Sequence, residues 1–163
     1  MAASYDLLPH RELERPVLIM ALEGWIDAGM AASGAAAALL DDLDTELVAR
    51  FDADELLDHR ARRPVLHLVD GVSEGLTWPS IEVFAGRDLD DRDVLLLAGP
   101  EPDHSWRAFA HAVVALAADL GVTQVVGLGA YPATVPHTRP IRLSITAGSE
   151  ELAGRWPYLR GSL

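Results

Sequence analysis

The sequence contains no cysteine, no lysine and no asparagine, and all 13 of its basic residues are arginine. The absence of cysteine excludes a disulfide framework, a thiolate nucleophile and a cysteine-based metal site. The absence of lysine excludes a Schiff base with pyridoxal phosphate and the lysine of a Walker phosphate loop. Several large classes of enzyme are therefore removed, and we expect the chain to use no cofactor.

Positive charge is also scarce, because 25 acidic residues outnumber the 13 basic ones and give a formal net charge of -12. Nucleic acids and anionic membranes bind to basic patches, so we expect neither as a partner. Residues 1–16 lack the layout of a signal peptide. The longest apolar stretch, residues 28–40, is shorter than the roughly 20 residues that span a bilayer. These features predict a soluble, cytoplasmic protein, and a length of 163 residues suits a single domain.

Three short apolar runs are each followed by a segment rich in glycine, proline, tryptophan, aspartate or histidine. Runs of this length are typical of strands that are buried on both faces of a largely parallel sheet. Ligands of open α/β sheets bind outside the carboxyl ends of such strands, so we expect the three following segments to share one edge. The runs and their following segments are 17–22 with 23–29, 94–98 with 99–106, and 125–130 with 131–140.

The remaining pattern predicts an α/β fold of three layers, in which helices flank a mixed, mostly parallel sheet. Asp27 is expected to cap the first helix, and Asp103 or Ser105 the second, whose apolar positions run from Trp106 to Leu120. Gly34 in the first helix suggests close packing on the sheet. The strand at 80–84 is expected to pair with that at 64–69 across turn residues between them. Strands are predicted at 16–22, 46–51, 64–69, 80–84, 93–98, 124–130 and 141–146, helices from 28 to 43 and from about 106, and a helical turn at 52–58.

Motifs for catalysis, metals and dinucleotides are incomplete. Gly127-Leu128-Gly129 follows a strand but lacks the third glycine of a dinucleotide fingerprint. His104 and His111 have no evident third ligand, so we expect no metal site. Anion binding remains open, because two helix N-termini and Arg139 would favour negative charge at the shared edge. The alternative is that Asp27, Glu101 and Asp103 already occupy those helix ends.

Five motifs in the same order resemble the actinobacterial branch of the family related to the second proteasome assembly chaperone. The resemblance implies a phosphorylase/hydrolase-like α/β fold, and its eukaryotic relatives imply a protein-binding role in proteasome assembly. A carboxylate–amine ligase label borne by some members does not suit a chain without lysine. The motifs are Gly24-Trp25-Ile26-Asp27-Ala28-Gly29, Asp58-x-Arg60-x-x-Arg63-Pro64, Leu76-Thr77-Trp78-Pro79, Gly99-Pro100-Glu101-Pro102-Asp103 with Trp106, and Pro136-His137-Thr138-Arg139-Pro140.

The resemblance also bears on the length of the chain. The resemblance implies that family members are considerably longer, so we expect residues 1–163 to form a single α/β domain that corresponds to the N-terminal part of a longer architecture. Assembly chaperones of this group can dock through a C-terminal tail of a hydrophobic residue, tyrosine and any residue. Pro157-Tyr158-Leu159 has this form but is internal, and the final Gly161-Ser162-Leu163 does not match.

We therefore expect a non-enzymatic, homo-oligomeric domain that binds other proteins, with proteasome subunits as candidate partners. Trp156 and Tyr158 are candidate contact residues near the end of the chain. The alternative is an enzyme or sensor for a phosphate- or nucleoside-like anion, in which Arg139 and His137 bind the anion and Asp27 or Asp103 acts as acid or base. The residues expected to bind the ligand or partner are Gly24, Trp25, Asp27, Gly99, Glu101, Asp103, Trp106, Pro136, His137, Thr138 and Arg139.

Overall fold

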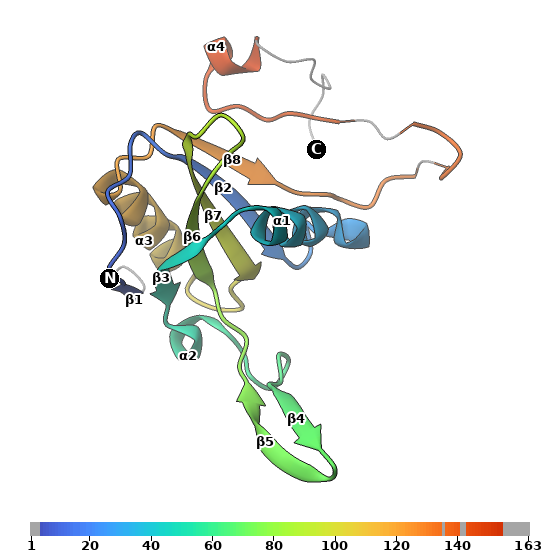
Figure 1. Ribbon diagram of the computed structural model, residues 1–163. Helices are drawn as coiled ribbons and strands as arrows, with labels where there is room; N and C mark the ends of the chain where they lie inside the picture. The colour runs from blue at the N-terminus through green and yellow to red at the C-terminus, as the bar shows by residue number, and fades with distance from the viewer. Residues whose placement is uncertain (1–3, 135, 141–142, 155–163) are drawn as a thin grey trace. The chain divides into compact units, whose positions relative to one another are not determined.

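The computed structural model describes residues 4–134, 136–140 and 143–154 (Figure 1). The chain forms two compact units, Met1–Pro132 and Ala133–Leu163, and each is described by itself. The first unit holds the sheet and the long helices. The second contains the short helix α4 (Glu150–Ala153), whose first turn is capped where the Ser149 hydroxyl accepts from the N–H of Leu152 at 3.3 Å.

The first unit is built on a six-stranded mixed sheet in the order β1-β3-β6-β7-β2-β8, and a separate two-stranded sheet contains β4 and β5. The helical elements of the same unit are η1 (Ala28–Met30), α1 (Ala31–Asp42), α2 (Ala53–Leu56) and α3 (Trp106–Asp119). The strands are β1 (Tyr5–Leu7), β2 (Val17–Glu23), β3 (Glu46–Phe51), β4 (Val65–Val69), β5 (Val72–Thr77), β6 (Glu82–Arg87), β7 (Asp93–Pro100) and β8 (Gln124–Leu128).

The three apolar runs become three adjacent parallel strands, as predicted. β2 lies between β7 and β8, and Ile19 of β2 is in register with Leu96 on one side and Val126 on the other. The other strand pairs of this sheet, β1 with β3, β3 with β6 and β6 with β7, are antiparallel. The carboxyl ends of β2, β7 and β8 therefore lie at one edge, which is where the candidate site was expected.

Helices cover both faces of the sheet, which confirms the three-layer α/β prediction. Successive residues of a strand point to opposite faces. Leu95 and Leu97 of β7 accordingly pack in the larger core with Phe109 of α3, whereas Leu96 packs with Ala32 of α1 in the smaller core. Burial of these apolar side chains provides the main stabilisation of the unit, at roughly 25 cal/mol per Å² removed from water.

The first helix differs from its prediction in two respects. It opens with the 3-10 turn η1 and continues as α1 only after Gly29 and Met30, which both have left-handed φ angles of 67° and 57°. Gly34 does not serve close packing, because it is exposed and a Cβ added there would meet nothing within 4 Å. The close contact with the sheet is made by Ala32 and Ala36 instead.

Two strand predictions were wrong. The partner of residues 64–69 is β5 and not residues 80–84, which contribute to β6 of the main sheet. The turn between β4 and β5 needs only Asp70 and Gly71, with φ angles of 50° and 81°, so residues 72–77 are free to form a strand. Residues 143–146 carry no strand, and Ile141 and Arg142 lie outside the described residues. Apolar alternation alone does not form a strand unless a neighbouring strand pairs with it.

Candidate functional site

The loops after β2 and β7 are joined through Glu101 at the carboxyl edge of the parallel strands. The backbone N–H of Glu101 donates to the carbonyl of Glu23 at 2.8 Å. Its carboxylate in turn accepts from the backbone N–H of Trp25 at 3.0 Å and lies directly against Gly24, where a Cβ would overlap it. The structure thus brings Gly24, Trp25 and Glu101 together, and the role of Gly24 is to leave room for that carboxylate.

Asp27 caps helix α1, as predicted, although a 3-10 turn separates it from the helix. One carboxylate oxygen, Oδ1, accepts from the N–H groups of Ala32 at 2.8 Å and Ser33 at 3.1 Å. The Ser33 hydroxyl, together with these two N–H groups, holds the pKa of Asp27 below its ordinary value despite partial burial. A backbone bridge from Asp27 to Ala130 ties the same loop to the end of β8.

Asp103 was expected to cap the second long helix, but its carboxylate instead holds the segment that contains Asp58 and Arg62. Its Oδ2 atom accepts from the backbone N–H of Asp58 at 2.9 Å and from Nε of Arg62 at 3.0 Å. The pKa of Asp103 is lowered first by the Asp58 N–H and then by the Arg62 guanidinium. Asp103 therefore does not cap α3, and Ser105, with a left-handed φ of 54°, makes no side-chain cap hydrogen bond either.

The structure explains why glycine occupies position 99, which the sequence motif alone did not show. Its φ of 126° favours glycine, and a Cβ there would overlap the carbonyl oxygen of Ser80. This close approach lets the end of β7 pass beside the segment that leads into β6. Gly99 therefore shapes this edge of the sheet.

The aromatic side chains of the edge are exposed. Trp25 is 74% exposed and Trp106 is 49% exposed, with the Trp106 ring edge-on to Phe109 at a centroid distance of 6.3 Å. Trp106 also lines a groove of about 490 Å³ between α3 and the strands β2 and β8, and none of the lining residues carries a charge. The lining residues are Met20, Leu22, Trp106, Phe109, Ala110, Val113, Val114, Ala117, Ala118, Val122, Thr123, Gln124 and Val125.

The other predicted residues belong to the second unit or lie outside the described residues. Pro136 to Arg139 form an exposed turn in which the N–H of Arg139 donates to the carbonyl of Pro136 at 3.0 Å. Pro136, His137, Thr138 and Arg139 thus form one local group. Trp156 and Tyr158 lie outside the described residues.

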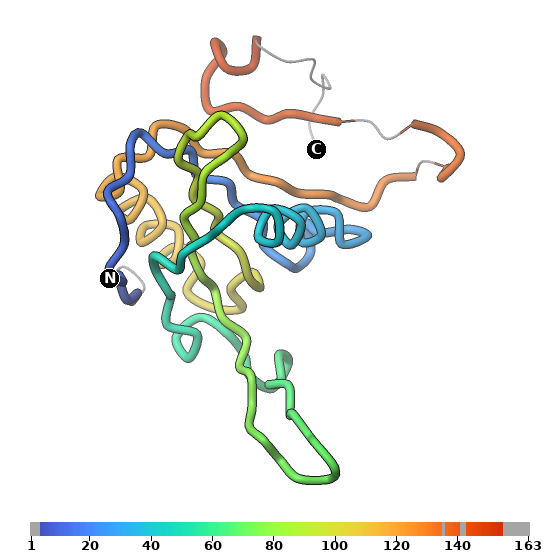
Figure 2. The backbone as a smooth tube through the Cα atoms, in the orientation of Figure 1, coloured from blue at the N-terminus to red at the C-terminus, as the bar shows by residue number. Residues whose placement is uncertain are grey.

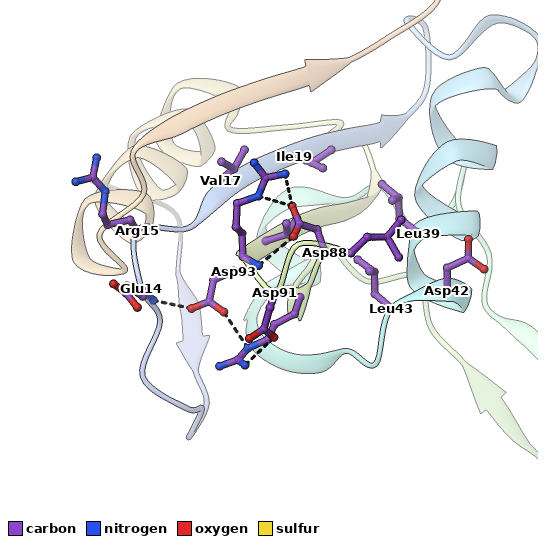
Figure 3. A pocket seen from close by; sticks show the side chains of 14 residues that line it. Glu14, Arg15, Val17, Ile19, Leu39, Asp42, Leu43, Asp88, Asp91 and Asp93 are labelled. Carbon is purple, nitrogen blue, oxygen red and sulfur yellow. Dashed lines mark hydrogen bonds and ion pairs between the residues drawn. The ribbon is translucent and has the colours of Figure 1, made fainter.

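A larger cavity, of about 880 Å³, lies at the opposite end of the sheet and was not expected (Figure 3). Asp93, at the start of β7, accepts from Arg11 at 2.6 Å and from the N–H of Glu14 at 2.6 Å. Nearby, Asp88 pairs with Arg92 at 2.8 Å. An aspartate directly before an apolar strand is the only sequence signal for this network, and its arginine partner is 82 residues away. The contacts of Asp93 with Arg11 and Glu14 fasten the N-terminal segment to the sheet, whereas the Asp88–Arg92 pair lies within the turn between β6 and β7.

In the part of the chain that the structure describes, no group of three or more histidine, aspartate or glutamate side chains is placed to hold a metal ion. Within those same residues, no helix combines the length and the apolar character needed to cross a bilayer.

The family model described as "PAC2 family" matches residues 21–158, which is most of the chain. The chain belongs to the PAC2 family. This confirms the resemblance drawn from the five motifs. No curated protein matches the chain.

Solved structures of other PAC2-like proteins agree with the fold. The chain is 45% identical to Rv2714 of Mycobacterium tuberculosis, a protein of unknown function, with a TM-score of 0.84 over 94% of this chain and 55% of that one. It is 39% identical to Rv2125 of the same organism, described as a proteasome-assembly chaperone homologue, with a TM-score of 0.80 over 86% of this chain and 60% of that one. A PAC2 family protein from Streptomyces avermitilis is 37% identical, with a TM-score of 0.79 over 91% of this chain and 65% of that one. The chain therefore spans between about half and two thirds of the length of these relatives.

Proposed function

We propose that this PAC2 domain binds proteasome subunits during their assembly and acts by protein–protein contact rather than by catalysis. The observation that carries the proposal is that charged and aromatic side chains have different roles at the carboxyl edge of the parallel strands. The charged side chains there are engaged in holding loops together, whereas the tryptophans are exposed.

The carboxylates of this edge are poorly suited to catalysis. Glu101 holds Trp25, Asp27 holds α1, and Asp103 holds the segment at Asp58 and Arg62. A general acid or base must reach the proton that it transfers, and its pKa should lie near the working pH. The pKa values of Asp27 and Asp103 are instead lowered, so both side chains stay ionised at neutral pH.

The exposed aromatic groups suit a protein interface. Tryptophan is enriched among the residues that dominate binding energy, and interface centres are poor in charge. Trp106 stands beside an uncharged groove, and Trp25 is the more exposed of the two. A subunit awaiting its neighbour presents an apolar surface of matching character. The relation to a proteasome-assembly chaperone homologue supports proteasome subunits as the partner. We further propose a cytoplasmic location and a homo-oligomeric state.

Binding to purified proteasome subunits tests the proposal directly. Purified actinobacterial α and β subunits are titrated separately against the immobilised protein by surface plasmon resonance. We expect binding to at least one subunit, and Trp106→Ala should weaken it about 30-fold if the side chain is a hot spot worth about 2 kcal/mol. Leu89→Ala is the matched control, because Leu89 is fully exposed in the turn between β6 and β7. Failure of the folded protein to bind either subunit would contradict the proposal.

A further inference from the structure

The loop between β2 and α1 presents three large apolar side chains to solvent. Trp25 and Met30 are both 74% exposed, and Ile26 is 45% exposed. Tyr131, which lies just after β8, adds a fourth side chain that is 40% exposed. These four side chains form the Trp25 patch. Large apolar side chains that gather on a surface are typical of a site that contacts another protein.

The two segments that carry the patch are joined by backbone hydrogen bonds. The N–H of Ala130 donates to the carbonyl of Ile26 at 2.6 Å, and the N–H of Ala28 donates to the carbonyl of Ala130 at 3.0 Å. Figure 2 shows the segments side by side, the loop after β2 in blue and the segment after β8 in orange. Because Tyr131 directly follows Ala130, both segments contribute to one edge of the sheet.

The backbone of the loop is held in one conformation although part of it is strained. Met30 has a left-handed φ of 57°, which is unusual for a residue other than glycine, and it follows Gly29 with a φ of 67°. Such strain persists only where surrounding contacts fix it, and it occurs often at binding sites. Here Asp27 accepts from the first N–H groups of α1, and Glu101 accepts from the N–H of Trp25. A loop that is already ordered loses little conformational entropy when it binds a partner.

The patch is uncharged in a strongly acidic chain. Asp27 is the only charged residue among residues 24–30, and residues 128–132 contain none. Backbone N–H groups engage the carboxylates of both Asp27 and Glu101, as described above. Glu23, exposed at the end of β2, lies outside the patch, where interfaces are usually polar. An uncharged apolar surface is complementary to a partner surface that is also apolar and uncharged.

We propose that the Trp25 patch is a preformed apolar projection that inserts into an uncharged apolar pocket of a proteasome subunit. The proposal rests on the function proposed above and names a contact through which that function acts. A tryptophan seated in a pocket is typical of the residues that dominate binding energy, and methionine adapts its shape to an apolar partner. The patch differs from the groove beside Trp106, because it supplies side chains to the partner rather than receiving them.

Surface plasmon resonance with purified actinobacterial α and β subunits tests the location of the contact. Trp25→Ala and Met30→Glu should each raise the dissociation constant at least tenfold, because the first removes a large side chain and the second places a carboxylate in an apolar pocket. Trp78→Ala is the matched control, since Trp78 is 52% exposed outside the patch, and it should change the constant less than twofold. Both patch positions are largely exposed, so the variants should melt at the temperature of the wild type.

The charge of the partner pocket is tested at position 30 alone. Met30→Arg should weaken binding as much as Met30→Glu does, because either charge is costly in an uncharged apolar pocket. Met30→Leu keeps an apolar side chain of similar size and should bind as the wild type does. Retained or tighter binding by Met30→Arg would show that the partner surface is acidic and would overturn the proposal.

Glu101 tests whether the loop must be preformed. Glu101→Ala removes the acceptor of the Trp25 N–H and should weaken binding several-fold, although Glu101 itself is not part of the patch. Glu101→Gln keeps an acceptor oxygen of the same reach and should restore the affinity of the wild type. Equal affinities for Glu101→Ala and the wild type would overturn preformation of the loop as a source of affinity.

The inference and the function on which it rests fail in different ways. A folded wild type that binds neither subunit would overturn the proposed function, and the inference with it. A wild type that binds a subunit while Trp25→Ala and Met30→Glu bind just as tightly would overturn the inference alone.

Discussion

Asp93 is the most deeply buried of the described charged side chains, and its partners decide whether it stabilises the fold. Burial alone would raise the pKa of Asp93, but the N–H of Glu14 and the guanidinium of Arg11 outweigh burial and hold the pKa below 3.8. Asp93→Asn should therefore lower the free energy of unfolding by about 2–3 kcal/mol, the contribution typical of hydrogen bonds to a charged group. Urea denaturation at pH 7 measures this loss. Asp42→Asn, at an exposed carboxylate for which no partner is shown, is the control.

The dependence on pH follows from the direction of the same shift. Because the pKa of Asp93 is lower in the folded chain than in the unfolded one, its stabilisation is complete above the unfolded value of 3.8 and is lost as the pH falls through the folded value. The difference in unfolding free energy between wild type and Asp93→Asn should thus shrink below about pH 4. A difference that is the same at pH 3 and pH 7 would show that the carboxylate charge contributes nothing.

Helix α1 carries a glycine that nothing in the described structure requires. Gly34 is exposed, its φ is not positive, and an added Cβ would meet no atom within 4 Å. Gly34→Ala should therefore stabilise the protein by about 0.5–1 kcal/mol, because glycine loses more backbone entropy than alanine in a helix. The melting temperature should rise by about 1–4 °C for a domain of this size. Gly99→Ala is the contrasting variant and should destabilise, since a Cβ there overlaps Ser80. A lower melting temperature for Gly34→Ala would contradict this account of the helix.

The elements that the sequence predicts well are those whose burial leaves a pattern. The parallel strands β2 and β7 are apolar because both of their faces are covered, so they could be recognised without a structure. β5 could not, because its Ser73, Glu74 and Gly75 have the composition of a turn and no face of the strand is buried.

In the candidate site, likewise, a contact between residues close in the sequence could be predicted, and one between distant residues could not. The cap formed by Asp27 is local in sequence and was predicted. The contact of Asp103 with Arg62 joins residues 41 positions apart, and local spacing carries no information about it. The motif Asp58-x-Arg60-x-x-Arg63-Pro64 drew attention to two arginines, yet the intervening Arg62 makes the bond to Asp103. The positions of residues in the motif were informative, whereas their roles required the fold.

At the scale of the whole molecule, the acidic balance and the absence of lysine both disfavour an anionic ligand. The formal net charge of -12 repels phosphate, and the helix that follows β2 has its N-terminus occupied by Asp27. Arg62, which contacts the β7 loop, is engaged by Asp103 and by the carbonyl of Glu101. An enzyme or sensor for a phosphate- or nucleoside-like anion would instead need free cationic donors at this edge.

Thermal melting with small ligands distinguishes the proposed protein-binding function from that of an enzyme or sensor for an anion. A ligand that binds only the folded state adds about 2.7 kcal/mol at a hundredfold excess over its dissociation constant, which corresponds to a rise of roughly 5–10 °C in melting temperature for a domain of this size. We expect no such rise with inorganic phosphate, adenosine or ATP, each at 10 mM as an order-of-magnitude excess over typical binding constants. Sodium chloride at equal ionic strength is the control, because screening alone relieves repulsion in a chain of this charge. A rise specific to one anion, abolished by Arg139→Ala, would establish the exposed turn of the second unit as a ligand site and would favour a small-molecule function over a protein-binding one.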